Sequence, residues 1–139
     1  MMLVKTYVAA SGIEGVGVYA GEPIAKGTTL WRFDPRFDRT LTIEELEALP
    51  EGVRAFLEKY SYPHHAEEGI IVLELDNGRF MNHSTEPNTD FSQMDFGHAL
   101  RDIKAGEELT CDYVDFDPTF ALLPSDVARF TGHHAGLAE

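Results

Sequence analysis

Cysteine is almost absent from this sequence, and the absence excludes several classes of protein. The single cysteine, Cys111, rules out an intrachain disulfide framework and a zinc site built from several cysteines. A lone cysteine also fits a reducing compartment. The opening stretch, residues 1–8, is too short and too polar for a signal peptide or a spanning helix. We therefore expect a cytoplasmic protein without membrane contact.

Basic residues are also scarce. Lysine and arginine number 11 against 24 aspartate and glutamate residues, which gives a formal net charge of −13. General nucleic-acid binding needs cations to neutralise phosphates, so direct nucleic-acid contact is not expected. An acidic field favours encounter with a basic protein partner, although the same charge also serves solubility.

The remaining composition is that of one globular domain. The chain has 139 residues, of which 43% are hydrophobic, enough for one moderate core. Several segments are rich in β-branched and aromatic residues, or alternate apolar and polar residues with a period of two, and they predict a mainly β fold. The expected strands cover residues 4–9, 16–20, 28–33, 70–75, 96–103 and 107–114.

A short helical insert interrupts these strands. Thr42 and Glu45 have the spacing of a capping box, and apolar residues then recur at helical intervals. We predict two short helices over roughly residues 43–61, within an insert over about 42–62. The aromatic residues there, Phe56, Tyr60 and Tyr62, are expected in the core. Asp76-Asn77-Gly78 predicts a hairpin with a type I′ turn.

A glycine-rich turn precedes the second expected strand. Gly15, Gly17 and Ala20 match a dinucleotide-binding pattern in form. That motif must open a long helix, whereas here Val16 and Val18 alternate as in a strand, so we reject it. The glycines instead indicate a place where the backbone approaches another group closely, or an ordinary turn.

A polar segment lies between hydrophobic runs at residues 79–88. Asn82, His83 and Ser84 bring many hydrogen-bonding atoms into a stretch that the flanking hydrophobic runs predict to lie in the interior. Buried polar atoms must be paired, or each costs about 1–3 kcal/mol. The segment is therefore either a structural knot or a site for a polar ligand.

Three segments in this order resemble the SET domain family of protein-lysine methyltransferases. They are Gly15-Val16-Gly17, then Arg79-Phe80-Met81-Asn82-His83-Ser84 with Pro87-Asn88, then Arg101-Asp102-Ile103 with Gly106-Glu107-Glu108-Leu109-Thr110-Cys111-Asp112-Tyr113. The resemblance covers about residues 4–116 of a single domain. It implies a mainly β fold of several small sheets, the β-clip, in which the asparagine-histidine segment and the last strand form a pseudoknot.

The resemblance also implies an activity and its residues. The expected reaction is methyl transfer from S-adenosylmethionine, leaving S-adenosylhomocysteine, to the side-chain amine of a lysine. The expected substrate is a basic, histone-like or otherwise lysine-rich protein, and no metal is required. Tyr113 matches the catalytic tyrosine. The implied cofactor-binding residues are Glu14, Gly15, Val16, Gly17, Asn82 and His83.

Two features depart from the usual pattern of the family. Cys111 occupies a position in the substrate channel, beside Tyr113, where an aromatic residue is usual, so we expect room for more than one methyl group. No cysteine cluster follows Tyr113, so a zinc-stabilised module is not expected. The aromatic tail, about residues 116–131, is the candidate for closing the channel, and Phe116 is expected to contact the adenine of the cofactor.

Three other interpretations remain open. A Cys–His hydrolase would use Cys111 and His83, but it needs a thiolate of low pKa. A metal site would use His64-His65 or His133-His134, although adjacent surface histidines are usually just exposed. The main rival is a SET-like module that binds a protein without catalysis. The oligomeric state is also open, with a homodimer as one option.

Overall fold

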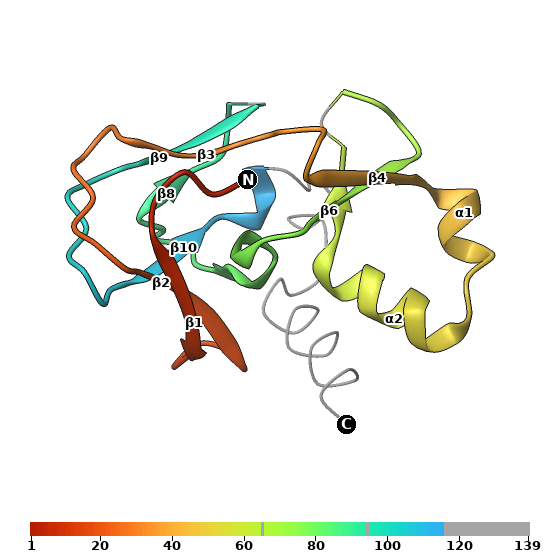
Figure 1. Ribbon diagram of the computed structural model, residues 1–139, viewed down its shortest axis with the longest axis horizontal. Helices are drawn as coiled ribbons and strands as arrows, with labels where there is room; N and C mark the ends of the chain where they lie inside the picture. Colours follow the sequence, from red (N-terminus) through yellow and green to blue (C-terminus); the bar gives the residue numbers. More distant parts are fainter. Residues whose placement is uncertain (65, 94, 116–139) are drawn as a thin grey trace.

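The chain folds into three small sheets and a short helical insert in the computed structural model, which describes residues 1–64, 66–93 and 95–115 (Figure 1). The strands are β1 (Thr6–Ala10), β2 (Val16–Ala20), β3 (Thr29–Arg32), β4 (Asp38–Thr42), β5 (Tyr62–Pro63), β6 (Ile70–Glu74), β7 (Asn82–His83), β8 (Thr89–Asp90), β9 (Phe96–Ala99) and β10 (Glu108–Cys111). The helices are α1 (Ile43–Glu47), α2 (Glu51–Tyr60) and the short 3-10 helices η1 (Asn77–Phe80) and η2 (Tyr113–Asp115).

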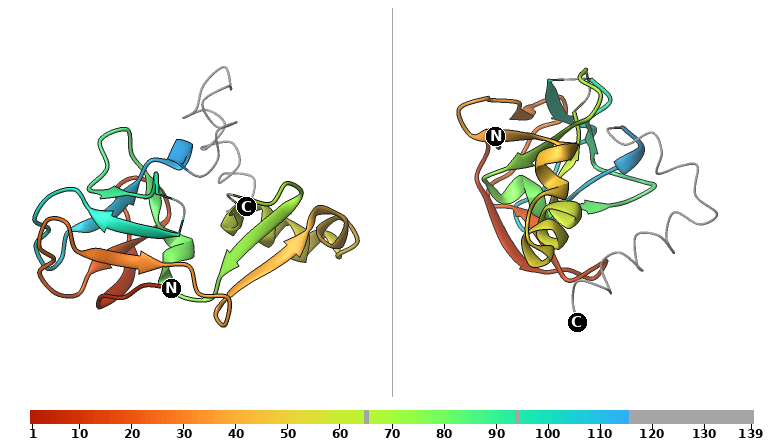
Figure 2. Two further views of the ribbon diagram at one scale, coloured as in Figure 1. Left: turned by 90° about the horizontal axis from the view of Figure 1, so that it is seen from above. Right: turned by 90° about the vertical axis from the view of Figure 1, so that its right-hand side faces the viewer.

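The strand orders are β1-β2-β10-β7, β3-β9-β8 and β4-β6-β5. This arrangement confirms the predicted mainly β class. Within the described ranges, no helix is long and apolar enough to cross a membrane. The two helices lie with β4 and β6 on one side of the molecule, away from β1 and β2 (Figure 2).

The helical insert forms as predicted and has its own small core. Thr42 accepts a hydrogen bond from the Glu45 N–H at 3.0 Å, and the Glu45 side chain accepts one from the Thr42 N–H at 3.1 Å. This capping box pairs two N–H groups that would otherwise lack partners at the start of α1. Leu46, Leu57 and Ile71 then pack the two helices against β6.

The main core lies between the other two sheets. Its fully buried residues come from segments far apart in the chain, among them Val18 on β2, Leu30 on β3 and Leu109 on β10. Burying such side chains contributes roughly 1.5–3 kcal/mol each. The strand predicted over 96–103 ends earlier, at Ala99, and Ile103 forms only an isolated bridge with Ile24.

The predicted hairpin at Asp76-Asn77-Gly78 is wrong, because these residues begin the helix η1. Asp76 caps η1 by accepting a hydrogen bond from the Gly78 N–H at 3.0 Å. β6 already lies between β4 and β5, so neither of its edges is open to a further hairpin partner. Tertiary pairing therefore overrode the local turn preference. The sequence also did not reveal β4.

The polar segment and the last strand interlock as the resemblance implied. β7 pairs in parallel with β10, with Asn82 opposite Thr110. Farther along, the Asn88 side chain donates to the Glu108 carbonyl at 2.8 Å and accepts from the Thr110 N–H at 2.9 Å. The Thr89 hydroxyl donates to the Thr110 carbonyl at 2.6 Å. We call residues 82–89 the knot segment.

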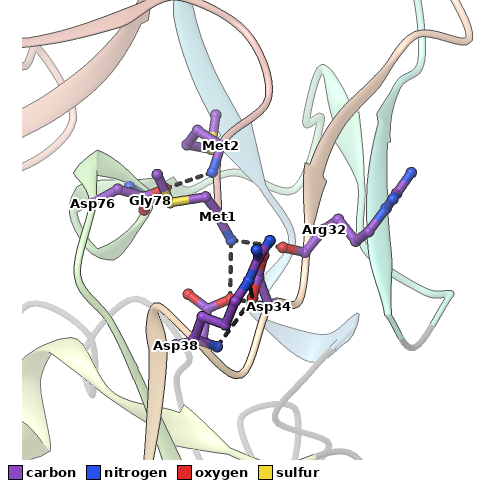
Figure 3. Close-up of polar contacts among 8 residues, drawn as sticks. Met1, Met2, Arg32, Asp34, Asp38, Asp76 and Gly78 are labelled. Atoms are coloured by element: carbon purple, nitrogen blue, oxygen red, sulfur yellow. Dashed lines mark hydrogen bonds and ion pairs between the residues drawn. The ribbon is translucent and has the colours of Figure 1, made fainter.

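The first residues are anchored to the same part of the fold (Figure 3). The Met1 ammonium donates to the Arg32 carbonyl at 2.7 Å and pairs with the fully buried Asp38 carboxylate at 3.0 Å. The Met2 N–H donates to Asp76. These contacts tie β3, β4 and the turn after β6 together beside a cavity.

Candidate active site

Two adjoining cavities lie between the insert and the main core. The larger has a volume of about 120 Å³, and the smaller about 30 Å³. Both are bordered by Lys59, Tyr60, Arg79, Met81 and Tyr113. These shared residues form the boundary at which contents of the two cavities would meet.

Tyr113 stands at this boundary. Its hydroxyl donates to the Met81 carbonyl at 2.6 Å, and its N–H donates to the His83 ring nitrogen Nδ1 at 3.1 Å. Burial raises the pKa of Tyr113 well above its usual value, with Cys111 and Glu108 adding to the effect. The phenol therefore stays protonated near neutral pH and remains a hydrogen-bond donor.

The position of Tyr113 differs in one respect from the sequence prediction. We expected a strand over 107–114, but β10 ends at Cys111 and Tyr113 begins η2. The Asp112 side chain accepts a hydrogen bond from the Val114 N–H at 3.0 Å, which favours the turn over a longer strand. Cys111 and Tyr113 nevertheless both border the larger cavity.

The smaller cavity has walls from the turn between β1 and β2 and from the knot segment. Glu14, Gly15, Val16 and Asn82 border it. Gly15 has a φ of 44°, a left-handed conformation that glycine adopts without strain. The Asn82 amide donates to the carbonyls of Glu14 at 3.2 Å and Val16 at 3.0 Å. The knot segment therefore holds the glycine turn in place.

The Glu108 carboxylate, which was not predicted from the sequence, supports this wall without lining the cavity. The Glu108 side chain accepts hydrogen bonds from the Ser11 hydroxyl at 2.8 Å and the Asn82 amide at 3.0 Å. Gly17 lies so close that an added Cβ would approach Glu108 Oε2 to 2.4 Å. The contact explains why a residue without a side chain is needed there. Only the three-dimensional contact distinguishes Glu108 from the neighbouring Glu107.

Most residues lining the larger cavity are aromatic or apolar. They are Trp31, Phe33, Tyr60, Tyr62, Val72, Met81, Phe91, Cys111 and Tyr113, and the remaining lining residues are Lys59, Glu74, Gly78, Arg79, Ser92 and Asp115. The expectation that Phe56, Tyr60 and Tyr62 belong to the core is wrong: Tyr60 and Tyr62 border the cavity, and Phe56 is 44% exposed. Helical spacing alone cannot show that part of the packed face borders a cavity.

The contacts of Cys111 argue against a hydrolase. Its thiol is buried, and burial raises its pKa well above the usual value, with Glu74 adding to the effect. Its sulfur lies 4.0 Å from the Asn82 carbonyl oxygen, and His83 Nδ1 already accepts the Tyr113 N–H. A nucleophilic cysteine needs the opposite, a thiolate of lowered pKa.

Some predicted residues lie elsewhere or outside the described part. Gly17 and His83 are not among the residues lining either cavity. Gly17 lies against Glu108 behind the wall, and His83 accepts the hydrogen bond from the Tyr113 N–H. Their cofactor roles stay predictions. Phe116 and the closing tail fall outside the described residues, as do His65 and His133-His134. In the part that the structure describes, no three His, Cys, Asp or Glu residues form a group that would hold a metal.

The two cavities thus meet at a boundary that includes Tyr113, whose hydroxyl is held by the Met81 carbonyl. The SET domain model matches residues 15–114, most of the chain. The chain therefore belongs to the SET domain family of protein-lysine methyltransferases, which use S-adenosylmethionine.

Two relatives place the chain at a distance from histone methyltransferases. It is 30% identical over 118 residues to the histone-lysine N-methyltransferase trr of Drosophila melanogaster. It is 31% identical over 120 residues to a Plasmodium falciparum protein described as a candidate histone-lysine N-methyltransferase. Each match covers 78% of this chain but only 5% and 2% of the relatives' lengths, respectively.

Solved structures support the fold alone. The Plasmodium falciparum structure of a candidate histone methyltransferase matches with a TM-score of 0.57 and 22% identity, over 81% of this chain and 95% of that one. The polycomb repressive complex 2 of Chaetomium thermophilum matches with a TM-score of 0.57 and 24% identity, over 79% of this chain and 15% of that chain. These similarities agree with the arrangement of three sheets and an insert.

Proposed function

We propose that this chain transfers a methyl group from S-adenosylmethionine to the side-chain amine of a lysine in a basic protein. The supporting observation is the Tyr113 hydroxyl, bonded to the Met81 carbonyl at 2.6 Å on the boundary shared by the two cavities. The smaller, polar cavity would take the donor, and the larger, aromatic one the lysine side chain. The net charge of −13 suits a basic substrate such as a histone-like protein.

The residues around the smaller cavity carry groups suited to parts of such a donor, which would also extend beyond the cavity's volume of about 30 Å³. The donor combines a carboxylate, an amine and an adenosine, and the wall offers the cations Lys59 and Arg79 together with main-chain groups at Glu14 to Val16. When bound, the donor supplies a methyl group on a cationic sulfur. The Arg79 guanidinium already donates to the carbonyls of Leu75 and Asp76, which fixes its position beside the cavity.

The protein's own contribution is positioning and exclusion of water. The Tyr113 hydroxyl and the Met81 carbonyl present a fixed dipole at the boundary, and such preorganised dipoles are usually a large part of catalysis. The aromatic and apolar residues of the larger cavity would desolvate a lysine side chain that entered it, and desolvation lowers the pKa of the ammonium. Tyr113 orients the amine and does not act as a base, because its own pKa is raised.

Substituting Tyr113 tests the assignment. Tyr113→Phe should reduce methyl transfer about 100-fold or more, since one fixed donor of this kind typically contributes that much. The assay measures labelled methyl transfer to a mixture of purified core histones. Tyr7→Phe is the matched control, because Tyr7 lies on β1 against Tyr19 and away from both cavities. Unchanged transfer by Tyr113→Phe would remove the assignment.

Calorimetry with S-adenosylmethionine separates this proposal from the rival function. Donor binding without transfer to any basic protein would favour a non-catalytic module. Methyl transfer by the unsubstituted protein that is lost in Tyr113→Phe would exclude a non-catalytic module.

The product range is a second prediction. Cys111 is smaller than an aromatic side chain and borders the larger cavity, so it leaves space beside the amine. We expect dimethyl or trimethyl products at saturating donor, measured by mass spectrometry of the substrate lysine. Cys111→Phe should shift the products toward monomethyl-lysine. Monomethyl-lysine as the sole product of the unsubstituted protein would contradict the prediction.

A further inference from the structure

The larger cavity contains a carboxyl group that neither the family resemblance nor the mechanism above uses. Glu74, the last residue of β6, is only 6% exposed and borders the cavity. Its Oε2 atom lies over Gly78, where an added Cβ would come within 2.3 Å. Gly78 also borders the cavity. The fold therefore reserves space for this carboxyl group in a wall whose residues are mostly aromatic or apolar.

The charged groups around Glu74 already have other partners. Asp38 on β4 accepts from the Met1 ammonium at 3.0 Å (Figure 3). Asp76 accepts from the Gly78 N–H at 3.0 Å and from the Met2 N–H. Within the described ranges, no lysine, arginine or histidine forms an ion pair with Glu74.

Near neutral pH these surroundings favour the neutral form of Glu74. Burial raises the pKa of Glu74 to about 8, and the nearby Asp76 and, to a lesser extent, Asp38 add to the increase. The Met1 ammonium and the Trp31 side chain oppose it. Tyr62 on β5 also faces the group, and its pKa is raised by burial and by Glu74. A cation that entered the cavity would reverse the balance and favour the carboxylate.

The other charged residues at the cavity are less suited to pair with a lysine ammonium: two of them are cations themselves, and the third is Asp115. Asp115 is more exposed and already accepts the Phe91 N–H at 3.2 Å. Arg79 is held by main-chain carbonyls, and Lys59 lies with its ammonium 5.3 Å from the centre of the Tyr60 ring. A lysine ammonium removed from water needs a counter-charge, because a buried unpaired charge is strongly unfavourable.

We propose that Glu74 binds the ammonium group of the target lysine inside this cavity, releasing its own proton as the ammonium enters. The inference rests on the proposed function, which assigns the larger cavity to lysine. In the resulting pair, a proton moves from lysine Nζ to Glu74: the N–H bond breaks, an O–H bond forms, and the lone pair stays on Nζ. The amine becomes neutral without leaving a net charge in the cavity.

Calorimetry with n-butylammonium chloride tests the proposal without knowledge of the substrate. The measurement is made near neutral pH in two buffers of different ionisation enthalpy, which gives the number of protons released. The unsubstituted protein should release close to one proton per butylammonium bound. Glu74→Gln keeps the shape but cannot ionise, so it should bind about tenfold more weakly or worse and release no proton.

The control is Glu107→Gln, which removes a carboxylate outside both cavities and should keep the proton release. Circular dichroism checks that Glu74→Gln is folded. Failure of the unsubstituted protein to bind butylammonium, binding without proton release, or unchanged binding by Glu74→Gln would each overturn the proposal. Methyl transfer to poly-L-lysine is measured in parallel. Transfer without proton release would reject Glu74 alone, and proton release without transfer would reject the proposed function alone.

Discussion

The two cavities are built by different means. The wall of the smaller cavity is held by side chain–main chain hydrogen bonds, with Asn82 bridging Glu14 and Val16 and Glu108 supporting them from behind. Most residues in the wall of the larger cavity are aromatic or apolar, and this wall includes groups with raised pKa values, such as Glu74. In the proposed function, a donor that is the same in every reaction suits a wall fixed by hydrogen bonds. A lysine that must lose its charge suits a wall that shifts pKa values.

A first test of this contrast removes the side-chain hydrogen bonds that join the knot segment to β10. Asn88→Ala removes the partners of the Glu108 carbonyl and the Thr110 N–H, both inside the fold. Unpaired buried polar groups cost about 1–3 kcal/mol each, so we expect the free energy of unfolding to fall by about 3 kcal/mol. Urea denaturation measures this change.

A matched asparagine shows whether the loss belongs to the knot segment. Asn77→Ala removes the hydrogen bonds of the Asn77 amide to the Thr6 hydroxyl at 3.0 Å and to the Thr6 carbonyl at 3.4 Å, and should cost about 1 kcal/mol. Equal losses for the two variants would mean that the knot segment has no special role in stability.

The next largest effect should come from crowding the polar wall. Gly17→Ala would place a Cβ 2.4 Å from Glu108 Oε2 and 3.1 Å from the Asn82 amide nitrogen, so Glu108 must move. Overpacking of this kind typically costs about 1–3 kcal/mol, and we expect donor affinity to fall about tenfold. Calorimetry with S-adenosylmethionine measures the affinity.

Gly12→Ala is the control for this crowding, because no atom lies within 4 Å of the added Cβ. It changes the same turn region without disturbing Glu108. Donor affinity that is lost equally in both variants would point to a general effect on the turn and against the role of Glu108.

Sequence patterns found the parts of the fold that depend on local order. The capping box at Thr42 and most strands are visible because their signals lie within a few neighbouring residues. The turn at Asp76 was predicted wrongly because its outcome depends on β4 and β5, which pair with β6 from distant positions. β4 was missed because Asp38 is buried by an ion pair with the Met1 ammonium, an arrangement that leaves no apolar alternation to read.

The candidate site was likewise predicted only where its residues could be recognised from their order in the sequence. Tyr113 and Asn82 were found through a resemblance in sequence order, and both border the smaller cavity. Glu108 and Glu74 were not found, because a glutamate on a strand looks the same in sequence whether it faces water or a cavity. Their contacts with Gly17 and Gly78 distinguish them, and those contacts exist only in three dimensions.

The sharpest test of the contrast between the two cavity walls is the pH dependence of stability at Glu74. The pKa of this carboxyl is near its usual value in the unfolded chain but about 8 in the folded protein. Between these two values the folded state binds more protons than the unfolded state, so the free energy of unfolding falls as pH rises. The decrease due to this group approaches about 1.4 kcal/mol for each pH unit, and the stability it contributes is fully lost above about pH 8.

Glu74→Gln removes this ionisation and should flatten that part of the stability curve. Urea denaturation at several values between about pH 5 and pH 8 measures the slope for both proteins. The half-buried Glu107, whose pKa is lowered by the Lys104 N–H and Arg101, is the control, because Glu107→Gln leaves the Glu74 slope intact. If Glu74→Gln keeps the full slope, the carboxyl is already ionised in the folded protein, and the two cavity walls do not differ electrostatically as we infer.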